Sequence, residues 1–276
     1  MADDSMADFT CAPFTSDGFT HDVFWSGSGP AVIVMAEMPG ITPNVLRFAR
    51  WVRDLGCTVV LPDLFGKAGF DSTWSAIGKA RGIAYGAKVL TQTCVRKEFV
   101  CWATGRSSPV VAWLRALGRE AHQRCGGPGI GAVGMCFTGG FALSMATDDR
   151  LLVPVLSQPA NPFGVTSKQR SSIDISDADL ATVQQRCAEG LEVIGLRFTG
   201  DRLVPPQRFA MLREKLGDSF IAVELPNEAA NPEADVPPHS MLTEHVIDQP
   251  GQPTRAAVDL VLDHLHRKLV APMSAN

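Results

Sequence analysis

The chain has 276 residues, of which 45% are hydrophobic and 20% are charged, and its net charge at neutral pH is −4. This length suits one α/β domain with a large core, and the weakly acidic balance gives no sign of a nucleic-acid partner. Residues 1–8 lack the basic and apolar regions of a signal peptide, and no run approaches about 18 apolar residues. We therefore expect neither secretion nor a membrane partner.

The seven cysteines form an odd set without a C-x-x-C pair. This pattern argues against a zinc site and against a disulfide framework. We expect free thiols, no metal and a reducing, cytoplasmic location.

The first part of the chain predicts a βαβ unit. Residues 18–25 are expected to form an edge strand, and the apolar run 31–36 a strand buried on both faces. Apolar residues three and four apart predict a helix over 43–55, stopped by Gly56, and residues 57–61 predict a second buried strand. Strand, helix and strand at this length indicate a parallel sheet.

The pattern weakens over residues 65–107, where glycines interrupt partial helical stretches. Such a segment between well-formed α/β units commonly covers or lines a site. Beyond it, helices are expected at 108–124, 141–146, 177–189, 205–216 and 252–269, and strands at 130–135, 151–156, 192–199 and 220–225. Without a repeat or linker, the chain predicts one α/β domain over residues 1–276, with a mostly parallel central sheet and helices on both faces.

Residues 134–140, with the sequence GMCFTGG, lie between an apolar strand and a helix. They form a thiol version of the G-x-S-x-G nucleophile elbow, in which glycines let the strand and helix pack closely around a strained turn. The turn would present Cys136 beside a helix N-terminus, which favours a thiolate and a developing oxyanion. The alternative is a buried structural cysteine, since free cysteines are among the most buried residues.

Three further polar residues follow predicted strands, where ligands bind in an open α/β sheet. Glu37 ends the first buried strand, Asp201 follows the strand at 192–199, and His239 follows the last strand and a proline-broken loop. The order nucleophile, acid, histidine is that of α/β-hydrolases, with 65 residues from Cys136 to Asp201 and 38 from Asp201 to His239.

This order assigns roles to the residues. His239 would take the thiol proton, and Asp201 would fix the imidazole tautomer and stabilise its charged form. The backbone N–H groups of Met38 and Phe137 are the expected donors to the oxyanion of the substrate. Asp201 has an alternative role as a turn residue, and Glu37 as a solvated loop acid.

Other histidines compete with His239. His245 lies six residues further on. The remaining candidates, which we expect at the surface, are His122, His264 and His266.

The elbow, Glu37, the sequence LPDL at 61–64, and the Gly-Asp and His-Ser pairs at 200–201 and 239–240 resemble the dienelactone hydrolase family of α/β-hydrolases. The resemblance runs from about residue 18 to residue 270. It implies a Cys136–His239–Asp201 triad whose resting thiol is held by Glu37 until substrate displaces that carboxylate. It also implies hydrolysis of lactones and small activated esters without metal or organic cofactor.

The chain departs from the family at the residues that would bind a carboxylate of the substrate. Dienelactone-cleaving members carry an arginine four residues after the triad histidine, where this chain has Thr243. A second family arginine is matched to Arg96, so Arg96, Trp102 and Arg106 are candidates for binding an acidic group, unless they form only a solvated basic run.

We therefore expect a hydrolase of small esters or lactones. The alternatives are another acyl-transfer enzyme on the same scaffold, such as a thioesterase, and a non-catalytic redox sensor built on Cys136.

Overall fold

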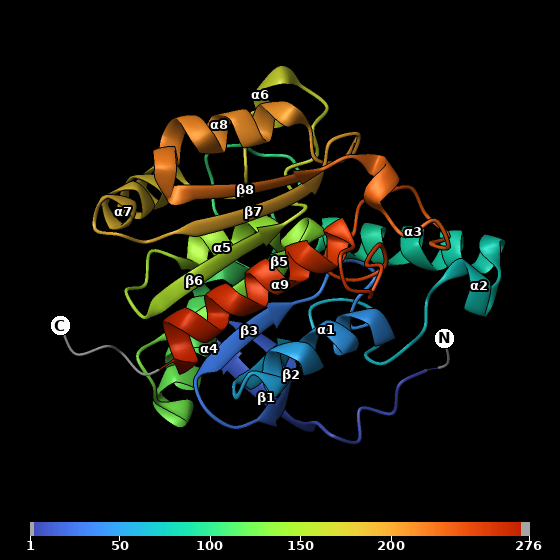
Figure 1. Ribbon diagram of the computed structural model, residues 1–276, viewed down its shortest axis with the longest axis horizontal. Coiled ribbons are helices and arrows are strands. Elements are labelled where there is room, and N and C mark those ends of the chain that lie inside the picture. Colours follow the sequence, from blue (N-terminus) through green and yellow to red (C-terminus); the bar gives the residue numbers. More distant parts are fainter. Residues whose placement is uncertain (1–2, 272–276) are drawn as a thin grey trace.

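A sheet of eight strands forms the centre of the computed structural model, which describes residues 3–271 without the side chains at positions 74 and 75 (Figure 1). The strand order is β1-β2-β4-β3-β5-β6-β7-β8. β2 runs antiparallel to β1 and β4, and the other neighbours are parallel. The strands are β1 (Thr10–Ser16), β2 (Phe19–Gly27), β3 (Ala31–Met35), β4 (Thr58–Pro62), β5 (Ile130–Met135), β6 (Leu151–Ser157), β7 (Val193–Phe198) and β8 (Phe220–Leu225). The predicted α/β-hydrolase fold is confirmed.

The strand expected at residues 18–25 is present as β2, but its expected edge position is wrong, because β1 lies outside it. Asp17 and Gly18 connect the two strands with φ angles of 50° and 80°, as a two-residue hairpin turn requires. β1 contains Pro13 and is exposed on most of its residues, so it lacks the hydrophobic alternation by which a strand is recognised.

Helices cover both faces of the sheet (Figure 1). α1 and α9 pack together over one face, and α4 and α5 pack over the other. The helices are α1 (Pro43–Asp54), α2 (Trp74–Ile77), α3 (Lys79–Val95), α4 (Val110–Cys125), α5 (Gly139–Met145), α6 (Ser167–Arg170), α7 (Asp177–Ala188), α8 (Pro206–Leu216) and α9 (Pro253–Leu265). Within residues 3–271, none of these helices combines the length and the apolar character that crossing a membrane requires.

Local sequence signals explain several helix ends. Thr42 accepts a hydrogen bond from the N–H of Val45 (3.3 Å), and Pro43 occupies the first turn of α1. Ser176 caps α7 by accepting a hydrogen bond from the N–H of Asp179 (3.1 Å), as its spacing predicts.

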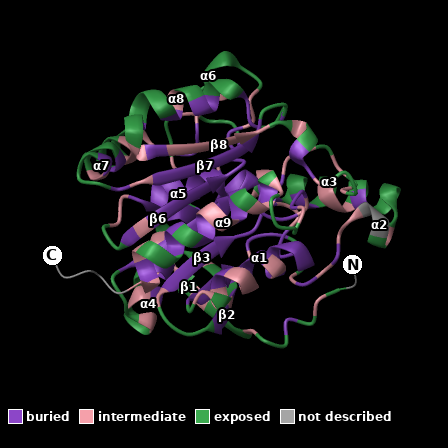
Figure 2. Ribbon diagram, in the orientation of Figure 1, coloured by how far each residue is buried: buried purple, intermediate pink, exposed green. Residues whose placement is uncertain are grey.

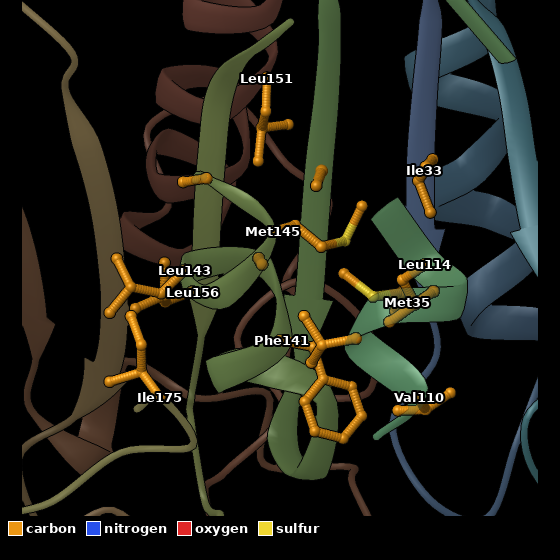
Figure 3. Close-up of a cluster of buried hydrophobic side chains, with 14 of the residues drawn as sticks. Ile33, Met35, Val110, Leu114, Phe141, Leu143, Met145, Leu151, Leu156 and Ile175 are labelled. Carbon is orange, nitrogen blue, oxygen red and sulfur yellow. The ribbon is translucent and has the colours of Figure 1, made fainter. Parts of the chain in front are cut away.

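The central strands are buried on both faces, whereas the outer helix faces are exposed (Figure 2). Figure 3 shows the core on the α4–α5 side, where Phe141 and Met145 of α5 meet Leu114 of α4 and Ile33 of β3. This packing fixes the position of the chain between β5 and α5.

The segment 65–107 contains two helices, of which α3 is 17 residues long despite its glycines. α2 and α3 project beside the sheet rather than lying flat against it (Figure 1). Only Gly82, Val89 and Thr93 are buried among the described residues of α3, so this helix is loosely attached to the core.

Candidate active site

Cys136 follows β5 at the centre of the sheet and has a φ angle of +54°. A non-glycine residue in this region is strained, which is the backbone signature of a nucleophile elbow. A Cβ at Gly134 would lie 2.2 Å from the carbonyl oxygen of Thr138, and one at Gly139 would lie 2.6 Å from Cα of Pro159. The glycines therefore allow strand and helix to approach as the motif predicts.

Neighbouring segments hold the turn in place. The hydroxyl of Thr138 accepts a hydrogen bond from the N–H of Met135 (2.8 Å) and donates to the carbonyl of Met35 on β3 (3.0 Å). The N–H of Ala160, after β6, donates to the carbonyl of Cys136 (2.8 Å). Strain at the elbow is thus offset by hydrogen bonds to both adjacent strands.

His239 and Asp201 form a hydrogen-bonded pair beside Cys136. Nδ1 of His239 lies 2.6 Å from Oδ2 of Asp201, whose other oxygen accepts the N–H of Leu203 (2.9 Å). Because Nδ1 is engaged with a carboxylate, it carries the hydrogen and leaves Nε2 as the free base. Nε2 is buried and has no hydrogen-bond partner among the described residues.

The electrostatics of His239 depend on Cys136. Burial lowers the pKa of the imidazole, but a Cys136 thiolate and the hydrogen bond to Asp201 outweigh burial and hold this pKa well above its ordinary value. Cys136 and His239 line the same cavity.

Glu37, at the end of β3, is buried and fully engaged with other side chains. Its Oε2 accepts hydrogen bonds from Ser240 Oγ (2.6 Å) and Gln158 Nε2 (3.1 Å). Its Oε1 accepts the hydroxyl hydrogen of Thr243. In the described part of the chain no hydrogen bond joins Glu37 to Cys136. The expected contact between the Glu37 carboxylate and the resting thiol is therefore not formed in this conformation.

Gln158 is a site residue that the sequence analysis missed. It follows β6 directly, has a φ angle of +34°, and is fully buried. Its Oε1 accepts the N–H of Met241 (3.1 Å), while its Nε2 donates to Glu37. Its place after a strand is the same signal that pointed to Glu37 and Asp201, and it ties the His239 loop to the sheet.

A cavity of about 1170 Å³ opens over these residues. Cys136, Asp201, His239, Glu37 and Met38 all line it. Phe137 is not among the lining residues, and its side chain packs into the core.

The cavity wall also includes part of the segment 65–107. The contributing residues are Ser72, Thr73, Gly82, Gly86 and Leu90.

The candidate substrate-binding residues Arg96, Trp102 and Arg106 do not line the cavity. Arg96 pairs with Glu98 (2.6 Å) and donates to the carbonyl of Leu64 (2.9 Å). Trp102 is 55% exposed and packs on Phe163, a cavity residue, at 5.3 Å between ring centroids. The basic run is therefore mostly a solvated surface, the alternative that the sequence left open.

The other histidines have structural roles or lie outside the site. Nδ1 of His245 accepts the N–H of Ser240 (3.1 Å), and its Nε2 lies 3.0 Å from the carbonyl of Val236, so it braces the His239 loop. The expectation that His264 lies at the surface is wrong: it is 1% exposed, because α9 turns this residue toward Glu192.

Arg208 of α8 is fully buried behind the site without a carboxylate partner among the described residues. It donates to four backbone carbonyls, those of Ser172 (2.6 Å), Pro159 (2.6 Å), Pro162 (2.6 Å) and Gln169 (3.1 Å). Burial lowers the pKa of its guanidinium to about 10. It organises the loop after β6, whose Ala160 contacts the nucleophile.

A mostly parallel sheet, a strained cysteine after β5 and a His–Asp pair on the following loops define an α/β-hydrolase. Residues 20–177 match the model of the dienelactone hydrolase family, and the chain belongs to that family. Membership makes it a carboxylic ester hydrolase. Across residues 3–271 no group of three or more His, Cys, Asp or Glu side chains is arranged to hold a metal ion.

Several solved structures have the same fold over nearly the whole chain. A dienelactone hydrolase-like promiscuous phosphotriesterase from metagenomic libraries is 14% identical, with a TM-score of 0.53, covering 95% of this chain and 98% of its own. A cold-adapted esterase from an Arctic intertidal metagenomic library is 16% identical, with a TM-score of 0.54 and 97% of each chain covered. A Thermus thermophilus protein is 14% identical, with a TM-score of 0.53, covering 96% and 99%.

At these identities the likeness shows the fold alone. A search among curated proteins finds no match.

Proposed function

We propose that the protein hydrolyses a carboxylic ester or lactone through a thioester acyl-enzyme on Cys136, with His239 as base and Asp201 as its orienting partner. One observation carries the proposal: Nδ1 of His239 lies 2.6 Å from Asp201, and its Nε2, which has no hydrogen-bond partner among the described residues, lies in the cavity that His239 shares with the strained Cys136. A redox sensor needs no such base.

In the first step the Cys136 thiolate attacks the substrate carbonyl carbon, and the proton of the thiol resides on Nε2 of His239. The N–H groups of Met38 and Phe137 donate to the developing oxyanion. The tetrahedral intermediate collapses, the C–O bond breaks, and Nε2 gives its proton to the leaving alkoxide.

Water completes the cycle. His239, now neutral, takes a proton from water as its oxygen attacks the thioester carbonyl. The intermediate expels the Cys136 thiolate and releases the acid, and Asp201 stabilises the imidazolium at both stages.

Glu37 holds two loops of the active site together. Its hydrogen bonds to Gln158, Ser240 and Thr243 join the loop after β6 to the loop that carries His239. Because the nucleophile is a thiolate, the enzyme requires reduced Cys136, and we place it in the reducing cytoplasm.

The test is turnover of p-nitrophenyl acetate by the parent, by Cys136→Ala and by Cys11→Ala, with folding checked by circular dichroism. Cys11 is exposed and is not among the residues that line the cavity, so its variant controls for loss of a thiol. We expect Cys136→Ala alone to lose activity, and acid-quenched parent to gain the mass of one acetyl group. Equal turnover by parent and Cys136→Ala overturns the proposal.

A further inference from the structure

We propose that the natural substrate is an uncharged ester carrying a bulky apolar group, which lies between α3 and the loop after β7. This inference rests on the proposed hydrolysis at Cys136 and names the substrate class of that site.

The size of the cavity is the first observation. At about 1170 Å³ it exceeds the range of about 300–1000 Å³ that is usual for small-molecule sites. A small lactone or an acetyl ester would leave most of this space to water. Burial of a larger apolar group would release that water and add binding energy.

α3 forms one wall with residues spaced by four along one face, Gly82, Gly86 and Leu90. A Cβ added at Gly86 would meet nothing within 4 Å, so the wall is hollow beside this residue. Leu90 is 37% exposed although it faces the cavity. This face of α3 therefore has open space beside Gly86 and a partly exposed apolar side chain at Leu90.

Other residues of the cavity lining supply more apolar surface. Leu203, two residues after Asp201, is 49% exposed and lines the cavity. Phe163 and Met38 line it too. Two exposed leucines in the lining of one cavity, Leu90 and Leu203, are explained by an apolar ligand that covers both.

The charges favour an uncharged ligand. The described lining includes the carboxylates of Glu37, Asp201, Glu233, Asp235 and Glu244. The guanidinium groups of the lining belong to Arg47 and Arg202. A carboxylate on the substrate would meet this excess of acidic groups.

Arg47 is the group that would recognise an anion if one binds. It donates to the carbonyl of Thr243 (2.9 Å) and lies over the Trp51 ring at 5.2 Å, while its Nε has no partner among the described residues. The experiment therefore includes an anionic substrate.

The experiment compares kcat/KM for p-nitrophenyl acetate, p-nitrophenyl octanoate and the mono-p-nitrophenyl ester of suberic acid, each below its micelle concentration. Octanoate and suberate have equal chain lengths and differ in the terminal carboxylate. The variants are Gly86→Leu, which fills the hollow beside α3, and Ala87→Leu, at an exposed neighbouring position outside the cavity lining.

For the parent we expect octanoate to exceed both acetate and suberate by about tenfold or more. Gly86→Leu is expected to lower the octanoate value about tenfold more than the acetate value, whereas Ala87→Leu leaves both values unchanged. Octanoate no better than acetate, or equal losses on both esters in Gly86→Leu, overturns the inference. Preference for suberate overturns it in favour of anion recognition by Arg47.

These failures differ from failure of the proposed function. If acetate is cleaved and Cys136→Ala abolishes that cleavage, the catalytic assignment stands whatever the chain-length profile. If Cys136→Ala cleaves all three esters as the parent does, the catalytic assignment itself is wrong.

Discussion

Thr243 donates its hydroxyl hydrogen to Glu37, at the position four residues after His239 where the family resemblance led us to look for an arginine. The side chain at this position points to the buried carboxylate and is itself fully buried. Thr243 therefore serves the internal network of the site, and its own side chain offers no positive charge to a substrate carboxylate.

Replacing Thr243 by valine keeps the shape and removes the donor. We expect a loss of about 1–3 kcal/mol in the free energy of unfolding, because Oε1 of Glu37 remains buried without this partner. The rate of ester hydrolysis is expected to fall about tenfold, because the loop that carries His239 is no longer held in position. Urea titration and steady-state kinetics measure both effects. Thr182→Val, on the exposed face of α7, is the matched control and should change stability by less than about 0.5 kcal/mol.

The raised pKa of His239 makes stability depend on pH. A histidine with a raised pKa in the folded state stabilises the fold fully below its ordinary value of 6.5, and this contribution is lost as the pH rises through the raised pKa. The unfolding free energy of the parent relative to His239→Gln should therefore shrink as the pH rises above about 6.5. In a Cys136→Ala background the change should be smaller, since the thiolate is a main cause of the shift. A difference that stays constant with pH would contradict this account.

Arg208→Met removes the donors to four buried carbonyls. We expect the unfolding free energy to fall by about 3 kcal/mol or more, because the acceptors are left unpaired away from water. Arg213→Met on the same helix is the control: its ion pair with Glu224 is half exposed and is worth less than about 1 kcal/mol. Equal losses in the two variants, measured by chemical denaturation, would show that Arg208 has no special structural role.

Asp63, after β4, destabilises the fold when it is ionised. Burial, aided by the charge of Asp22, raises the pKa of its carboxyl from 3.8 to about 6, and its Oδ1 is buried without a partner in the described structure. A raised carboxyl pKa favours the folded state at low pH, and this advantage is lost as the pH rises to about 6. Asp63→Asn should therefore stabilise the protein by about 1–2 kcal/mol at neutral pH, after allowance for solvent screening. Thermal unfolding at neutral pH and near pH 4 tests this, since the gain should vanish at the lower pH.

The sequence was sufficient to predict the fold and the residues that line the cavity at strand ends. Continuous apolar runs mark β3, β4 and β5, and Glu37, Cys136 and Asp201 each follow a strand, where parallel topology brings them to one edge of the sheet. Their catalytic roles stay predictions until they are tested.

Other features depend on tertiary contacts that leave no local pattern. Arg208 lies in α8 among other charged residues, and only the fold shows that it is buried against carbonyls. β1 was missed because its outward-facing residues carry no hydrophobic alternation, although the Asp-Gly turn marks a hairpin. Arg96 does not line the cavity, and charge alone does not tell a solvated surface from a cavity wall.

Because α3 is loosely attached, heating should affect the selectivity of the enzyme before it affects its catalytic activity. With few buried side chains, this helix should open locally, and its amide hydrogens should exchange with solvent before those of β3 and β5, which require global unfolding. The wall that holds the bulky group would then melt while the catalytic residues, fixed to the sheet, keep their geometry. On warming, the protein would become less selective among esters before it stops cleaving them.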